Sequence, residues 1–327
     1  MPHEFLVTYT RSGREESHHL GAYCVFRNGK AVRERGDTEV PVFYRSAAKP
    51  LQSLVVVESG AADRFGLTDP ELALTVGSHA GSPLHARTAA SILAKVGEGP
   101  EILRCGGHRS LDPRVHEDYI RRGYVPGRIE DNCSGKHAGM IAAAKALGAD
   151  PKSYADRDHP VQRRNLAGVA RFTGVAEDEI RIGVDGCAVP SFGVGVRAMA
   201  RAAALFGTPE ELPDATTEAV RRITRVVLAH PEMIAGDGLF DTQLIRAGKG
   251  KLLVKQGAEG VEIVSVVGER MGLAVKIGDG ARRAVRALLT ELLVELGLIT
   301  RRDATELAPR VVRTREGDPI GEIQVRL

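Results

Sequence analysis

A serine and a lysine lie three positions apart in the segment Arg45-Ser46-Ala47-Ala48-Lys49-Pro50. A serine hydroxyl is a poor nucleophile until a base removes its proton, and a lysine can be that base once its surroundings lower its pKa. Pro50 disfavours the α region for the residue before it, so we expect a helix to begin at Pro50 and both side chains to lie in the preceding turn. The pattern alone is weak, because both residues are common and an exposed turn produces it by chance several times more often than a catalytic pair does.

A second serine and a second lysine are found elsewhere in the chain. Ser78 lies in Gly77–Gly81, between an apolar run and the helix start at Ser82-Pro83, where small residues let a hydroxyl face a site. The plainer interpretations are a capping turn and, for His79, a structural histidine. Lys255 follows an apolar strand and precedes a glycine, so it is either an exposed lysine or a second amine facing the hydroxyls.

The segment 131–140 holds a thiol, a hydroxyl, an amine and an imidazole around one glycine, just before an expected helix. It does not fit a phosphate-binding loop, because the first glycine of that pattern is missing and a histidine follows Lys136. A helix N-terminus lowers the pKa of a thiol, so Cys133 is a candidate nucleophile or metal ligand. Such a density of reactive side chains favours function over packing.

A second thiol follows the strand-like segment 180–184. Asp185 and Cys187 lie at its end, a common place for functional residues. Cys133 and Cys187 could be soft ligands for zinc, with Lys136, His137 or Asp185 completing the shell. Their spacing matches no zinc-finger pattern, so metal binding does not follow from it.

The elements that must position these residues form a mixed pattern. Short β-rich runs with a hairpin signal at Arg27–Lys30 occupy the first forty residues, and β character returns after about residue 250. Helix signals dominate between them. We therefore expect an α/β (α+β) fold with one mixed sheet built from about 1–45 and 250–327, flanked by helices, and a helical subregion of about 50–230 inserted within the single unit 1–327.

Composition excludes several classes of protein. The chain has 327 residues with a formal charge of +3, which gives no footprint for nucleic acid or an anionic membrane. The N-terminus lacks the basic start and apolar run of a secretory signal, and no segment reaches the ~20 apolar residues of a membrane span. Four cysteines are no disulfide scaffold. We expect a soluble cytoplasmic protein.

Taken together, these residues resemble the bacterial L-asparaginase II family of the rhizobial type. The resemblance covers nearly the whole chain. It rests on Arg45–Pro50, Ser78-His79, Asn132–Met140, Asp185–Cys187, His230-Pro231, Ala235-Gly236, Phe240–Thr242, Lys255–Gly260 and Lys276–Gly280.

The resemblance implies a serine β-lactamase/glutaminase-like fold, a homodimer, and hydrolysis of L-asparagine to aspartate and ammonia. It implies two Ser–Lys pairs, Ser46 with Lys49 and Ser78 with Lys255. It also implies zinc, held by a set of three ligands with an aspartate beside it: Cys133, Lys136 and Cys187, with Asp185.

We expect Ser46, deprotonated by Lys49, to attack the side-chain amide, with Ser78 as an alternative nucleophile. Ser78 and Lys255 would then relay protons or hold the carboxamide. The substrate-binding candidates are Arg45, whose guanidinium fits a carboxylate, and with it His79 and Asp185.

Two rival functions stay open. The same site could act on glutamine or another small amide, since one methylene changes binding by only about 1–3 kcal/mol. Alternatively, the protein could be a non-catalytic zinc or thiol protein that uses Cys133 and Cys187. That rival leaves both lysines unexplained, and neither cysteine has a close Cys-x-x-Cys partner.

Overall fold

The computed structural model describes residues 4–327, so the first three residues of the N-terminus discussed above lie outside it. The chain divides into two compact units. Unit 1 contains the chain up to Ala47, Val194–Gly207 and Leu244–Leu327, and unit 2 contains Ala48–Gly193 and Thr208–Gln243. The chain therefore leaves unit 1 twice and returns to it twice.

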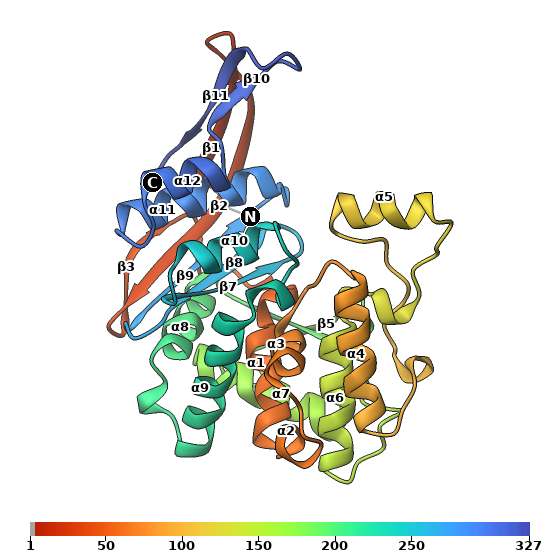
Figure 1. Ribbon diagram of the computed structural model, residues 1–327. Coiled ribbons are helices and arrows are strands. Elements are labelled where there is room, and N and C mark those ends of the chain that lie inside the picture. Colours follow the sequence, from red (N-terminus) through yellow and green to blue (C-terminus); the bar gives the residue numbers. More distant parts are fainter. Residues whose placement is uncertain (1–3) are drawn as a thin grey trace. The chain divides into compact units, whose positions relative to one another are not determined.

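Unit 1 is built on an antiparallel sheet (Figure 1) whose strand order is β10-β11-β1-β2-β9-β8-β7, with β3 also paired to β2. Strands from the two ends of the chain meet where β2 pairs with β9. The strands of unit 1 are β1 (Glu4–Arg11), β2 (Arg14–Arg27), β3 (Lys30–Arg35), β4 (Val42–Phe43), β7 (Leu252–Gly257), β8 (Val261–Val266), β9 (Met271–Ile277), β10 (Val311–Arg313) and β11 (Pro319–Val325).

Helices cover both faces of this sheet (Figure 1). Every residue of β7, β8 and β9 is buried, which explains why these strands are apolar throughout instead of alternating. The helices of unit 1 are α8 (Val196–Gly207), α11 (Arg282–Glu295) and α12 (Arg301–Leu307), and α10 (Phe240–Ala247) crosses the boundary between the units.

Unit 2 is mainly helical and has its own apolar core, drawn from α1, α3, α4, α6 and α9. Its helices are α1 (Lys49–Glu58), α2 (Ala61–Arg64), α3 (Asp69–Val76), α4 (Pro83–Lys95), α5 (Pro113–Arg121), α6 (Ser134–Ala146), α7 (Pro160–Thr173) and α9 (Asp214–Ala229). An antiparallel hairpin of β5 (Arg181–Val184) and β6 (Pro190–Val194) follows α7. Short 3-10 turns, among them η1 (Arg45–Ala48) and η5 (Pro231–Met233), connect the helices.

The expected fold class is confirmed: a sheet from both chain ends, flanked by helices, with a helical region inserted. The expectation of a mixed sheet is wrong, because the strands of this sheet pair antiparallel. The predicted hairpin turn is also present, with Asn28 and Gly29 both at positive φ. One difference concerns α1, which begins at Lys49 and not at Pro50, so that the proline occupies the second helical position, where its missing N–H costs nothing. No helix within residues 4–327 is long and apolar enough to cross a bilayer.

Candidate active site

A buried contact joins Lys49, at the start of α1, to Ser78, just after α3. The Lys49 amine lies 2.9 Å from the Ser78 hydroxyl and donates to the carbonyls of Gly77 at 2.5 Å and Asn132 at 3.2 Å. Lys49 has no exposed surface, and Ser78 is also buried. A buried amine is costly unless its donors are satisfied, and these three oxygens satisfy them.

The direction of the Lys49–Ser78 contact is what matters for chemistry. The two carbonyls can only accept, so they occupy two of the amine's hydrogens. The serine hydroxyl can either accept the third hydrogen or donate its own hydrogen to the lone pair of a neutral amine. At 2.9 Å a proton can pass directly between Lys49 and Ser78.

Ser78 lies in a tightly fixed turn, Gly77–Ser82, which we call the serine turn. Gly81 has φ 67°, and a side chain there would lie 2.2 Å from the Glu130 carbonyl, so only glycine fits. His79 accepts the Gly81 N–H at Nδ1, at 3.2 Å, and its Nε2 lies 3.1 Å from the Ser134 hydroxyl. His79, a candidate substrate-binding residue, is fully buried and stabilises the turn through these two contacts.

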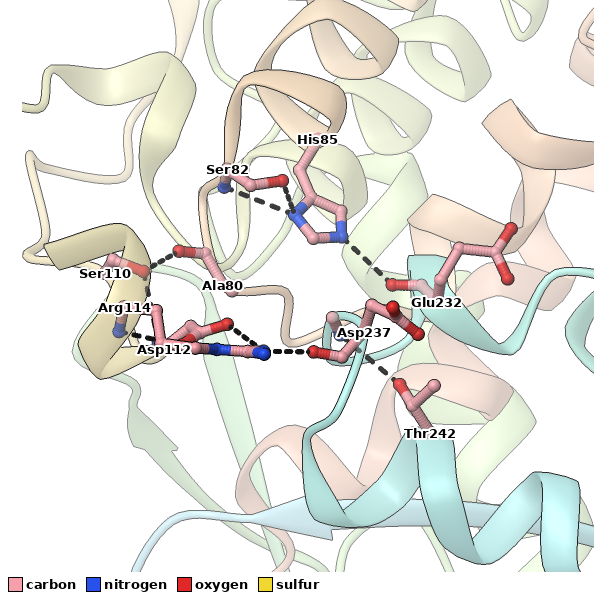
Figure 2. Close-up of polar contacts among 10 residues, drawn as sticks. Ala80, Ser82, His85, Ser110, Asp112, Arg114, Glu232, Asp237 and Thr242 are labelled. Carbon is pink, nitrogen blue, oxygen red and sulfur yellow. Dashed lines mark hydrogen bonds and ion pairs between the residues drawn. The ribbon is translucent and has the colours of Figure 1, made fainter. Parts of the chain in front are cut away.

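The serine turn is also held from outside by α5 and the segment before it. The Ser110 hydroxyl donates to the Ala80 carbonyl at 2.5 Å (Figure 2), and the Tyr119 hydroxyl donates to the Gly81 carbonyl at 2.7 Å. Sequence reasoning missed these residues, since α5 has no sequence link to the turn. Together the bonds leave the backbone around Ser78 little freedom, as a catalytic residue requires.

A second group of reactive side chains gathers at the N-terminus of α6. Cys133 precedes the helix and Lys136 follows it by three positions, so both lie on one helical face. The Lys136 amine donates to the Cys187 sulfur at 3.0 Å. The hydrogen bond from the Cys133 thiol, with the Lys136 charge, lowers the pKa of Cys187 to about 5. Burial would lower the pKa of Lys136, but the sulfur of Cys187 raises it above its ordinary value.

The neighbours of this group are less closely involved. Asp185 is half-buried, accepts the Gly186 N–H at 2.7 Å, and contributes to raising the pKa of Lys136. His137, an alternative ligand, contacts the Tyr154 hydroxyl at 2.5 Å through Nδ1. Burial lowers the pKa of His137 to about 3, so it stays neutral.

Zinc chemistry is compatible with the donors present. Among residues 4–327, no three His, Cys, Asp or Glu side chains are arranged to hold a metal ion. The expected set, however, uses a lysine as its third donor, and Cys133, Lys136 and Cys187 are buried together. Two thiolates and one neutral amine suit a soft divalent ion, so binding requires both the Cys133 thiol and the Lys136 amine to lose a proton.

Unit 1 contains the remaining candidates, Arg45, Ser46 and Lys255. Arg45 opens η1 with φ 52°, a left-handed conformation rare for a residue with a side chain, and Ser46 follows it half-buried. Lys255 is fully buried on β7 and donates to the Gln256 carbonyl at 2.8 Å. A side chain at Gly257, on the same face of β7, would lie 2.8 Å from the Tyr44 carbonyl. Unit 1 therefore brings this face of β7 against the segment that precedes Arg45.

Solved structures of other proteins are similar to this chain at low sequence identity. The crystal structure of Mglu in its native form shares 13% identity and a TM-score of 0.48, over 85% of this chain and 64% of Mglu, so the chain spans less than two thirds of Mglu. The β-lactamase/D-alanine carboxypeptidase from Pseudomonas syringae shares 10% identity and a TM-score of 0.44, over 84% of this chain and 93% of the other. The comparison with curated proteins gives no match.

The family described as L-asparaginase II matches residues 7–325, nearly the whole chain. The protein accordingly belongs to the L-asparaginase II family.

Proposed function

We propose that the protein hydrolyses L-asparagine to L-aspartate and ammonia through an acyl-enzyme. The observation that carries this proposal is the buried contact between the Lys49 amine and the Ser78 hydroxyl, in a chain of the L-asparaginase II family. Histidine is the usual base for a serine nucleophile, and here a lysine amine is in hydrogen-bond reach of a serine instead.

In the proposed first step, Ser46 attacks the side-chain amide carbon while Lys49 takes the hydroxyl proton. Ser78 passes that proton to the departing nitrogen, so ammonia leaves and an ester forms on Ser46. Water then cleaves the ester, which releases aspartate and restores the hydroxyl. Lys255 and Arg45 would hold the carboxamide and the α-carboxylate, since a guanidinium binds a carboxylate through two parallel hydrogen bonds.

A zinc ion would be held by Cys133, Lys136 and Cys187, and its bonds to these side chains would order this loop. The proposed proton transfers involve only side chains of the chain itself.

The decisive experiment measures ammonia release from L-asparagine and L-glutamine in parallel, with Ser46→Ala, Ser78→Ala and Ser59→Ala variants. Ser59 is the matched control, because its hydroxyl hydrogen-bonds to no described residue. We expect release from asparagine that falls at least about 10³-fold in the first two variants and is unchanged in the third. Intact-mass measurement after rapid acid quenching should detect the acyl-enzyme in wild type and not in Ser46→Ala.

Two results would overturn the proposal. No ammonia from either amide, with protein shown to be folded and supplied with zinc, would reject the reaction. Full acyl-enzyme formation in Ser46→Ala would reject Ser46 as nucleophile and transfer that role to Ser78.

A further inference from the structure

The serine turn rests on the loop that follows α9. The Ser78 N–H donates to the Ile234 carbonyl at 2.8 Å, and Ile234 comes directly after η5. The position of Ser78 therefore depends on where this loop lies.

One buried side chain joins that loop to the serine turn. His85 Nε2 lies 3.0 Å from the Glu232 carbonyl, within η5, and its Nδ1 lies 3.3 Å from the Ser82 N–H and 2.8 Å from the Ser82 hydroxyl (Figure 2). Because the carbonyl can only accept, Nε2 carries the hydrogen and Nδ1 is the acceptor. A single neutral imidazole thus bonds to the end of the turn and to the loop.

The surroundings hold this imidazole in one orientation. Its ring stacks on His79, with centroids 4.9 Å apart and planes at 20°, and it is only 2% exposed. The Thr242 hydroxyl donates to the Pro231 carbonyl at 2.9 Å and so holds the other side of the loop. Burial lowers the pKa of His85, which keeps it neutral.

We propose that His85 is a positioning residue that sets the hydroxyl of Ser78 against the amine of Lys49. Its Nδ1 contacts cap α4, which any capping residue could do. Its Nε2 contact is not needed for capping. That contact links η5 to the serine turn, and Ile234, directly after η5, accepts the Ser78 N–H. The inference rests on the proposed function only in treating Ser78 as part of the active site.

Two substitutions separate the two contacts of His85. In His85→Asn the side-chain oxygen reaches the place of Nδ1 and keeps the cap, while the bond to Glu232 is lost. In His85→Gln the amide nitrogen reaches the place of Nε2 and keeps that bond. His159→Asn is the matched control, because His159 is also buried, accepts the Val161 N–H at Nδ1 and contacts the Asp150 carbonyl through Nε2.

Hydrogen exchange of the peptide that covers the serine turn is measured together with kcat and KM for asparagine. We expect His85→Asn to raise the exchange rate about tenfold and lower kcat about tenfold, with KM within about twofold. His85→Gln should stay within about threefold of wild type in both the exchange rate and kcat. His159→Asn should lower Tm as His85→Asn does, without changing the exchange rate or kcat.

A purely structural role for His85 predicts that His85→Asn and His159→Asn behave alike, and that result would overturn the proposal. Equal defects in His85→Asn and His85→Gln would overturn it as well. If wild type releases no ammonia, the proposed function fails, and the exchange rates still decide whether His85 positions the turn.

Discussion

At the scale of single residues, two buried lysines of unit 2 meet different partners. The amine of Lys49 contacts neutral oxygens, two of which belong to backbone carbonyls. The amine of Lys136 contacts the sulfur of Cys187, whose lowered pKa makes it an anion at neutral pH. The Lys136 charge is therefore held by an ion pair, whereas Lys49 can exchange a proton with a hydroxyl.

Zinc binding should depend on the Cys187 sulfur and the Lys136 amine of this ion pair, and a buried thiol elsewhere should not replace them. We expect about one zinc per chain by elemental analysis after dialysis against zinc, and loss of that zinc in Cys187→Ala and Lys136→Met. Cys105→Ala is the control, since Cys105 is buried and burial raises the pKa of its thiol well above the ordinary range. Stoichiometric zinc in Cys187→Ala would contradict the proposed ligand set.

The lowered pKa of His85 predicts how stability depends on pH. Its pKa in the folded state lies below the ordinary histidine value of 6.5, so below about pH 6.5 the unfolded chain binds the proton first. The contribution of neutral His85 to the free energy of unfolding is complete above that pH. It is lost as the pH falls, at up to about 1.4 kcal/mol per pH unit. Urea unfolding at pH 7.5 and 5.5 should show His85→Asn closer to wild type at the lower pH.

The two serines and their lysines could be named from sequence, but the contacts between them required the fold. Spacing alone pairs Ser46 with Lys49, since three positions are close in any turn. The contact of Lys49 with Ser78 spans 29 positions and depends on how α1 packs beside α3. His85 was detectable, because the third position after a Ser-Pro helix start is where a capping box places its second residue.

At the scale of elements, the serine turn links α3 to α4 and is fixed by the groups around it. Its backbone accepts or donates bonds to side chains from α5, from the loop before α5 and from the serine turn itself. The turn can place Ser78 accurately because bonds from several elements hold its backbone.

A side chain at Gly81 should therefore destabilise the protein more than the positive φ of this residue alone would predict. Gly81→Ala adds a side chain 2.2 Å from the Glu130 carbonyl, and we expect it to lower the free energy of unfolding by more than about 3 kcal/mol. Gly148→Ala is the control: Gly148 has φ 70°, but nothing lies within 4 Å of an added side chain, so about 1 kcal/mol is expected. Chemical denaturation of both variants measures the difference, and equal losses would contradict the close contact.

Elements with strong local signals were predictable. The proline that opens α4 marked that helix start, and the hairpin signal marked β2 and β3. By contrast, α5 was not predicted, because it has only nine residues and only Tyr119 among them is buried.

At the scale of the whole molecule, each unit buries its own apolar residues. The large core cluster of unit 2 lies within residues 55–233 and contains no residue of unit 1. The apolar side of α8, in contrast, packs on β2, β8 and β9 of unit 1. The core of unit 2 is therefore complete without the sheet.

We predict that unit 2 folds without unit 1. A chain of residues 48–243, with Val194–Gly207 replaced by a Gly/Ser linker of equal length, should give helical circular dichroism and cooperative unfolding. It should release no ammonia, because Ser46 and Lys255 belong to unit 1. A non-cooperative melt would show that unit 2 depends on the sheet.

The pairing of β2 with β9 has a consequence for synthesis on the ribosome. Arg27 ends β2 and Met271 begins β9. At a synthesis rate of about 5–20 residues per second, β9 is therefore made roughly 12–50 s after β2. During that time the nascent chain carries an unpaired, apolar strand edge, while unit 2 can already fold beside the ribosome. We expect the N-terminal strands to be the part of the nascent chain that most needs a chaperone, although they lie in the centre of the folded sheet.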